Sequence, residues 1–205
     1  MTGIENESTH THNIRLQTPR LILREHRPED LMLLHAILSD PAVTWYLPGM
    51  YKAELSETEV YLRSVMRDAE SHHRLRCNLA VEDRVSGELL GSVGLHVIES
   101  APEGAHYGLG YFLRPASWNM GCATEAARAA LRFIFSGNAC RVSASCLAEN
   151  IGSRRVAEKC GMTQEGLLKA HTWHDGQWKD CAIYRILKGE FTEKEGTACQ
   201  NSGRT

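Results

Sequence analysis

One short segment, Trp-Asn-Met-Gly-Cys-Ala-Thr-Glu-Ala at residues 118–126, constrains the fold more than any other part of this sequence. Before it, residues 110–114 have the pattern of a strand that stops at Pro115. After it, small and apolar residues recur at helical spacing over residues 121–136. The first backbone N–H groups of that helix have no intrahelical partner, and the helix dipole is positive at the same end. The segment therefore predicts either a phosphate-binding turn or an ordinary capped helix.

The remaining pattern predicts a single α/β domain with a mixed, mostly antiparallel sheet flanked by helices. A strand, a helix and a further strand in succession over residues 105–147 indicate a right-handed βαβ unit, so the middle of the sheet is expected to be parallel. Strands are expected at residues 21–23, 77–81, 88–95, 105–113, 141–147, 167–173 and 179–187. Helices are expected to begin at Pro28 and to span residues 56–69, 121–136 and 153–159. For the helix over 56–69, the pattern predicts a capping box from Ser56 to Glu59 and an inner face of Val60, Leu62, Val65 and Met66.

Length, charge and composition exclude several classes of protein. A chain of 205 residues suits one sizeable domain, placed at residues 16–190 between polar tails at 1–15 and 191–205. A net charge of −2 with dispersed Lys and Arg gives no sign of nucleic-acid binding. No apolar run is long enough for a membrane span or a signal peptide, so a cytoplasmic location is expected. Seven cysteines without a Cys-x-x-Cys pair are expected to be mostly reduced and buried, and the ten histidines form no pattern that predicts a metal site.

Two motifs at matching spacing resemble those of a known family. Gly121 and Ala123 match the pyrophosphate-binding loop of the GNAT superfamily of N-acetyltransferases, in which Arg or Gln is followed by two residues, Gly, one residue, and Gly or Ala. Trp118 in place of Arg or Gln is similar to the RimJ/RimL-like branch, which acetylates ribosomal-protein N-termini. Residues 149–162 resemble that branch's Glu-Asn-x-x-Ser segment, and Thr-Pro-Arg-Leu-Ile-Leu-Arg at 18–24 resembles its opening. The likeness covers roughly residues 16–190.

The resemblance implies that acetyl-CoA is the cosubstrate and that it lies in a splay between two parallel strands. Backbone groups left unpaired there would bind the pantetheine amides. The implied cofactor-binding residues are Phe112, Leu113, Arg114, Trp118, Asn119, Met120, Gly121, Cys122, Ala123, Thr124 and Asn150. Asn119 stands where Gly is commoner in the family. Asn150 is also a good N-cap for the following helix, and both roles are compatible.

Catalytic roles follow partly from the resemblance and partly from proton chemistry. By resemblance, Ser153 is the expected proton donor to the departing thiolate. An attacking amine must also lose a proton. Related enzymes often have a Glu for this where Gly108 stands here, so the role is open. His106 is the first candidate because strand alternation puts it on the same face as Gly108, although an exposed His without a role fits equally; His96 is a weaker second candidate.

The sequence therefore predicts an N-acetyltransferase that joins acetyl-CoA to a primary amine by direct attack. The acceptor amine is expected to be a protein N-terminus or a small molecule, and the enzyme a monomer or homodimer. Cys122 as an acyl-carrying nucleophile lacks a supporting His or Asp pattern. Trp45, Tyr46, Trp173 and Trp178 are interpreted as core aromatics or as walls of an acceptor pocket, with at least two expected in the core. The alternative from another class is a regulatory module that binds acetyl-CoA without turnover.

Overall fold

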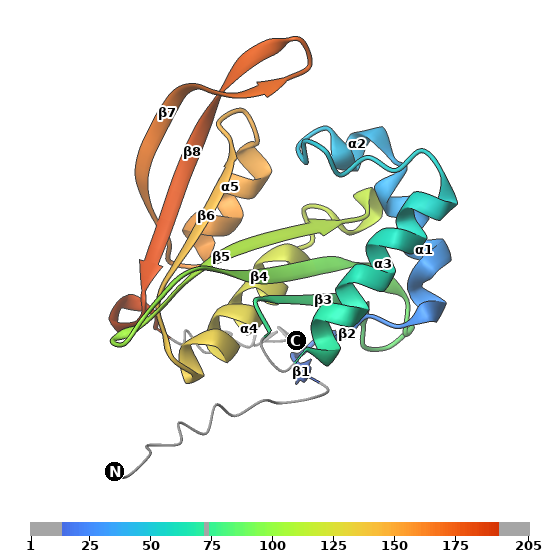
Figure 1. The fold of residues 1–205 in the computed structure, drawn as a ribbon, viewed down its shortest axis with the longest axis horizontal. Helices are drawn as coiled ribbons and strands as arrows, with labels where there is room; N and C mark the ends of the chain where they lie inside the picture. Colours follow the sequence, from blue (N-terminus) through green and yellow to red (C-terminus); the bar gives the residue numbers. More distant parts are fainter. Residues whose placement is uncertain (1–13, 72–73, 193–205) are drawn as a thin grey trace, which may run out of the picture.

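An eight-stranded mixed sheet forms the centre of the molecule (Figure 1). The computed structural model describes residues 14–71 and 74–192. The strand order within the sheet is β1-β2-β3-β4-β5-β6-β8-β7. The strands are β1 (Arg15–Gln17), β2 (Leu21–Glu25), β3 (Arg76–Asp83), β4 (Leu89–Ala101), β5 (Gly104–Leu113), β6 (Ala139–Leu147), β7 (Thr163–His174) and β8 (Gln177–Leu187). Only β5 and β6 are paired in parallel, which confirms the predicted mixed sheet with a parallel pair at its middle.

Helices cover the two faces of this sheet unequally (Figure 1). The helices are α1 (Leu31–Leu38), α2 (Pro41–Thr44), α3 (Leu55–Glu70), α4 (Cys122–Ser136) and α5 (Ile151–Lys159), with short 3-10 turns η1 (Pro28–Asp30), η2 (Pro115–Ser117) and η3 (Lys188–Glu190). Side chains of α1 and α3 pack on one face, near the middle of β3 and the start of β4. Helix α4 and part of α5 pack on the other face. The first face is therefore covered over β3 and β4, while β5, β6 and β8 extend beyond α1 and α3.

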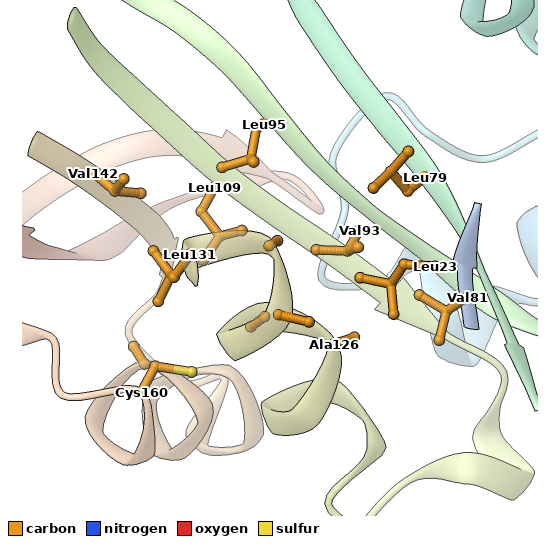
Figure 2. Close-up of a cluster of buried hydrophobic side chains, with 14 of the residues drawn as sticks. Leu23, Leu79, Val81, Val93, Leu95, Leu109, Ala126, Leu131, Val142 and Cys160 are labelled. Carbon is orange, nitrogen blue, oxygen red and sulfur yellow. The ribbon is translucent and has the colours of Figure 1, made fainter. Parts of the chain in front are cut away.

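The larger of the two apolar clusters lies between α4 and the sheet (Figure 2). Leu131 of α4 packs toward Leu109 and Val142, which belong to the two parallel strands. Alanines at Ala126, Ala127 and Ala130 bring the α4 backbone close to the strands, because they carry no bulk beyond Cβ. The start of α4 is thereby fixed next to the end of β5.

Several sequence expectations need correction. Helix α3 has its capping box at Glu54 and Glu57 instead of Ser56 and Glu59, and Val60 is exposed because its place on the inner face is taken by Thr58. β1 and α2 were not predicted, because they are three and four residues long and too short to show a period. Parts of the expected tails at 1–13 and 193–205 lie outside the described residues. At the inner boundaries, Ile14 is buried and Phe191 packs on Phe135.

The described helices include none that is both long and apolar enough to span a bilayer. Within residues 14–71 and 74–192, no group of three or more His, Cys, Asp and Glu side chains is placed to hold a metal ion. Of the described cysteines, Cys77, Cys122, Cys160 and Cys181 are buried, Cys146 is half-buried, and Cys140 is exposed.

Candidate active site

The turn between β5 and α4 has the backbone of an anion-binding loop. Gly121 is the N-cap of α4 and has a left-handed backbone with φ of 80°. Asn119 is also left-handed, with φ of 59°. Asn tolerates this conformation better than other residues with a Cβ, so Asn119 can adopt a left-handed backbone where Gly is commoner in the family. Because Gly121 has no side chain to cap the helix, the first N–H groups of α4 remain available to an anion.

A group of polar contacts ties this loop to the turn between β1 and β2. Glu125, in the first turn of α4, accepts hydrogen bonds from the Thr18 hydroxyl at 2.6 Å and from Arg20 Nε at 2.7 Å. Arg20 also donates to the carbonyl of Met120 at 2.8 Å. The pKa of Glu125 is lowered because these hydrogen bonds outweigh the effect of its burial. The carboxylate stays ionised, and Arg20 offsets its charge at the end of the helix where an anion would bind.

Trp118 closes the carboxyl end of β5. Its indole N–H donates to the carbonyl of Leu113 at 2.7 Å. Arg114, the residue after Leu113, turns away from β6. Its backbone N–H donates to the carbonyl of Leu90, and its guanidinium pairs with Glu88. The structure therefore places Trp118 and Leu113 at the loop, whereas the polar groups of Arg114 face β4.

The two parallel strands separate after one short stretch of pairing. Their ladder ends at the pair of Gly108 and Ser143, while β5 continues to Leu113 along β4 and β6 continues to Leu147 along β8 (Figure 1). Because Arg114 bonds to β4, strand alternation turns the backbone groups of Leu109 and Tyr111 toward β6. Beyond Gly108 no residue of β5 is paired with β6 within the described residues, so the backbone groups of Tyr111 have no β6 partner. The space between β5 and β6 beyond Gly108 and Ser143 is called the gap below. It is the splay that the sequence resemblance implied. Phe112 packs its side chain instead on the cluster beneath α1 and α3.

Helix α5 places Ser153 beside this gap. Asn150 caps α5 by accepting from the Ser153 backbone N–H at 3.0 Å, so its predicted capping role is present. The Tyr111 hydroxyl lies 2.9 Å from the Ser153 hydroxyl and 3.1 Å from the Ser153 carbonyl. Burial raises the pKa of Tyr111, so its hydroxyl stays protonated and remains a hydrogen-bond donor. Tyr111 had no predicted role, since only the packing of α5 brings it to Ser153.

The face of the sheet opposite α4 and α5, called the open face below, carries two imidazoles near the end of the β5–β6 pairing. His106 Nε2 is 2.8 Å from the hydroxyl of Ser143. His96 of β4 lies across Gly108, its direct partner on β5. Burial is the main cause that lowers the pKa of each ring, and a neighbouring arginine adds to it. Both rings are therefore mainly neutral at pH 7 and can accept a proton.

Three of the four aromatic residues named in the sequence lie outside the core. Trp45, next to α2, makes an edge contact with His174 at the end of β7, with ring centroids 5.1 Å apart. Trp173 and Trp178 form a second edge pair near the tip of the hairpin and are more than half exposed. The expectation that at least two of the four aromatics lie in the core is wrong for Trp45, Trp173 and Trp178. The contact of Trp45 with His174 joins α2 to the β7–β8 hairpin across the open face.

Comparisons with known proteins agree with this architecture. Residues 20–163 match the family described as the acetyltransferase (GNAT) domain, which is more than half of the chain. This protein belongs to the GNAT acetyltransferase family. The chain is 30% identical to the uncharacterized N-acetyltransferase YnaD of Bacillus subtilis over 181 residues, covering 87% of this chain and 99% of YnaD.

Solved structures give the same result for the fold. A GNAT-family acetyltransferase from Bacillus anthracis superposes with a TM-score of 0.74 at 29% identity, over 86% of this chain and 100% of that one. RimL, the ribosomal L7/L12 alpha-N-protein acetyltransferase, in complex with coenzyme A, has a TM-score of 0.73 at 20% identity, over 85% and 98%. The predicted resemblance to the RimJ/RimL-like branch is confirmed at the level of fold.

The acetyltransferase has the features that acetyl-CoA, its cosubstrate, requires. The free N–H groups at the start of α4 suit a diphosphate, and the unpaired backbone of Tyr111 suits the amides of a pantetheine arm. Around the loop, Asn119, Met120 and Gly121 are exposed, Ala123 and Thr124 are half-buried, and Cys122 is buried in the core. Cys122 therefore acts as a small packing residue beneath the loop.

Proposed function

We propose that this acetyltransferase acetylates a primary amine by direct attack, without a covalent enzyme intermediate. The observation that carries the proposal is the placement of groups around the gap between β5 and β6. Ser153, with Tyr111, borders the gap from the face of the sheet that holds α4 and α5. His96 and His106 lie on the other face. A group that can donate a proton and a group that can accept one therefore border the same gap from opposite sides.

Each residue has a defined task in this proposal. When bound, acetyl-CoA supplies an activated acetyl thioester. The N–H groups of residues 122–124 and the turn at 118–121 hold its diphosphate, and Leu109, Tyr111 and Leu113 hold its arm by backbone hydrogen bonds. Asn150 keeps the first turn of α5 in place, so that the Ser153 hydroxyl can protonate the departing sulfur. An imidazole on the open face takes the proton of the amine, and the two candidates are His106, the first choice from the sequence, and His96.

The cysteines near the site do not favour a covalent mechanism. Cys146 lies on β6 beside the gap, and burial raises its pKa to about 11. The thiol is therefore almost entirely protonated at pH 7 and is a poor nucleophile. Cys122 is buried in the core. Direct attack by the amine needs neither thiol.

The charges on the open face favour an acceptor with a single amine. Arg76 lies beside His96, and Arg141 lies beside His106, where it pairs with Glu165. A polyamine would require an excess of carboxylates, which this part of the described chain does not supply. Among proteins of the same fold, one is named as an N-terminal protein acetyltransferase and another, from Vibrio cholerae, as a spermidine N-acetyltransferase. The charge pattern supports the first kind of acceptor.

The test is a screen for coenzyme A release with matched acceptors. A peptide with a free N-terminus, the same peptide with a blocked N-terminus, spermidine and an aminoglycoside are supplied with acetyl-CoA. We expect release with the free peptide and little with the blocked one. Binding of acetyl-CoA by calorimetry without turnover of any amine would contradict the proposal and favour the regulatory module.

A further inference from the structure

The His96 ring fills the space that a side chain at position 108 would need. A Cβ built on Gly108 would lie 2.2 Å from His96 Cε1 and 2.4 Å from Nε2. Gly108 is not among the residues with positive φ, so its backbone would accept an ordinary side chain. The imidazole is therefore the only obstacle within 3 Å to a side chain at this position. Glycine at 108 allows His96 to lie flat against β5.

The position of the ring matters because Gly108 is the last residue of β5 that pairs with β6. Beyond it the two strands separate, so His96 lies at the inner end of the gap. His106 is paired two residues earlier, with Arg141, and its Nε2 lies within hydrogen-bond distance of the Ser143 hydroxyl. The described residues give the His96 ring no hydrogen bond. Of the two imidazoles, His96 is therefore nearer the gap and has its nitrogens available.

We propose that His96 accepts the proton of the attacking amine and that Gly108 positions it. This inference rests on the proposed function. An ammonium acceptor loses two protons when it becomes an amide. One passes to His96, directly or through one water, and is then released to solvent. The nitrogen bonds to the acetyl carbon as the carbon–sulfur bond breaks. Ser153 protonates the sulfur and regains a proton from the second N–H, so all atoms balance.

The charges around His96 keep the ring neutral. Arg76 on β3 is paired directly with it, and His106 faces it from β5. Around His106 lie Arg141 on β6, Glu99 on β4 and Glu165 on β7. Burial, and then the charge of Arg76, lower the pKa of His96 below its ordinary value. The charges of the open face favour an α-amino acceptor, such as a protein or peptide N-terminus. Its ammonium, with a pKa of about 8, gives up a proton more readily than an alkylammonium near 10.

The closing experiment removes the imidazole and then replaces its function from the other strand. For His96→Gln we expect kcat/KM for the free peptide to fall by about 10²-fold or more, with the acidic limb of its pH profile lost. Coenzyme A affinity should stay unchanged. Gly108→Glu alone should be inactive, because the new side chain clashes with the His96 ring. Combined with His96→Gly, the same glutamate should restore part of the rate with a new acidic limb.

Two further variants make the result decisive. His106→Gln should keep the acidic limb, because the ring that produces it remains. Gly108→Ala should lower the rate by displacing the His96 ring, which tests the position even if His96→Gln folds poorly. If the wild type is active while His96→Gln keeps its rate and its acidic limb, the inference is overturned and the proposed function stands. If the wild type binds acetyl-CoA but acetylates no amine, both are overturned.

Discussion

The hydroxyl of Tyr111 lies 2.9 Å from the hydroxyl of Ser153, and this contact joins β5 to the first turn of α5. Because the Tyr111 hydroxyl stays protonated, it can direct the Ser153 hydroxyl toward the gap and stabilise negative charge on it. We expect Ser153→Ala to lower kcat by about 10²-fold. Tyr111→Phe removes one hydrogen bond and should cost about tenfold. Steady-state kinetics with the free peptide measure both, and a Ser153→Ala enzyme with full turnover would contradict the assignment.

Asn150 is expected to affect stability more than chemistry. Its side chain caps α5 by accepting from the Ser153 backbone N–H. Loss of such a cap costs about 1 kcal/mol. Asn150→Ala should therefore lower the midpoint of thermal unfolding, and Asn150→Asp, which keeps the cap, should restore it. If Asn150 also binds the pantetheine arm, as the resemblance implies, calorimetry will show weaker acetyl-CoA binding by Asn150→Ala.

Arg20 should control affinity for coenzyme A through Glu125. The Arg20→Ala change leaves the Glu125 carboxylate without its partner at the end of α4 that receives the diphosphate. We expect the Kd for coenzyme A to rise by about tenfold, with a smaller effect at high salt because charge repulsion is screened. Arg128→Ala is the matched control, because it removes a cation from the same helix near Phe191 instead of the loop. Equal effects of the two variants in calorimetry would contradict this account.

Local sequence patterns were sufficient to predict most of the sheet. The antiparallel pair β3 and β4 could be predicted from alternating apolar residues within each strand. The parallel pair could be predicted because β5, α4 and β6 follow one another directly in the sequence. The cap of α3 was misplaced because Ser56 and Glu59, two residues after the real pair at Glu54 and Glu57, match the capping pattern. Two overlapping cap patterns cannot be ranked without tertiary contacts.

The chemistry around the gap depended on contacts that sequence patterns do not contain. His106 could be identified from the sequence, since it lies two residues from Gly108 on one strand. The position of His96 depends on the register between β4 and β5, including the irregularity between Val97 and Glu99, which no local pattern fixes. Tyr111 and Ser153 are 42 residues apart and meet only because α5 packs beside the gap.

Gly121 and Asn119 should respond differently to substitution. Gly121 has φ of 80°, and a Cβ there would approach Arg20 Nη2 to 3.4 Å. Gly121→Ala is expected to cost about 1–2 kcal/mol and to weaken coenzyme A binding, because the turn must relax. Asn119→Gly keeps the left-handed turn and should bind coenzyme A as the wild type does, whereas Asn119→Val should not. Chemical denaturation and calorimetry of the three variants test whether the backbone conformation of the turn sets affinity.

Far from the gap, a buried ion cluster is expected to control stability at low pH. Arg24 donates to Asp30 at 2.7 and 2.8 Å and to Glu82 at 2.6 Å, which fixes η1 on β2 and β3. Burial opposes ionisation of Asp30, but hydrogen bonds from the Arg24 guanidinium and the Arg27 backbone hold its pKa well below the usual range. The stabilisation of the folded state by the Asp30 carboxylate is therefore fully present above the pKa of Asp in the unfolded chain, about 3.9. It is lost as the pH falls below that value.

Asp30→Asn tests this cluster directly. The change leaves the buried Arg24 guanidinium without one of its two carboxylates, so we expect a loss of about 3–5 kcal/mol at pH 7. The difference from wild type should shrink as the pH falls below about 4, because the wild-type carboxylate then loses its own advantage. Glu59→Gln on α3, which removes a surface pair with Arg63, is the matched control and should change stability by less than about 1 kcal/mol. A difference that stays constant from pH 7 to pH 3 would mean that shape, and not the charge of Asp30, stabilises the contact between η1 and the sheet.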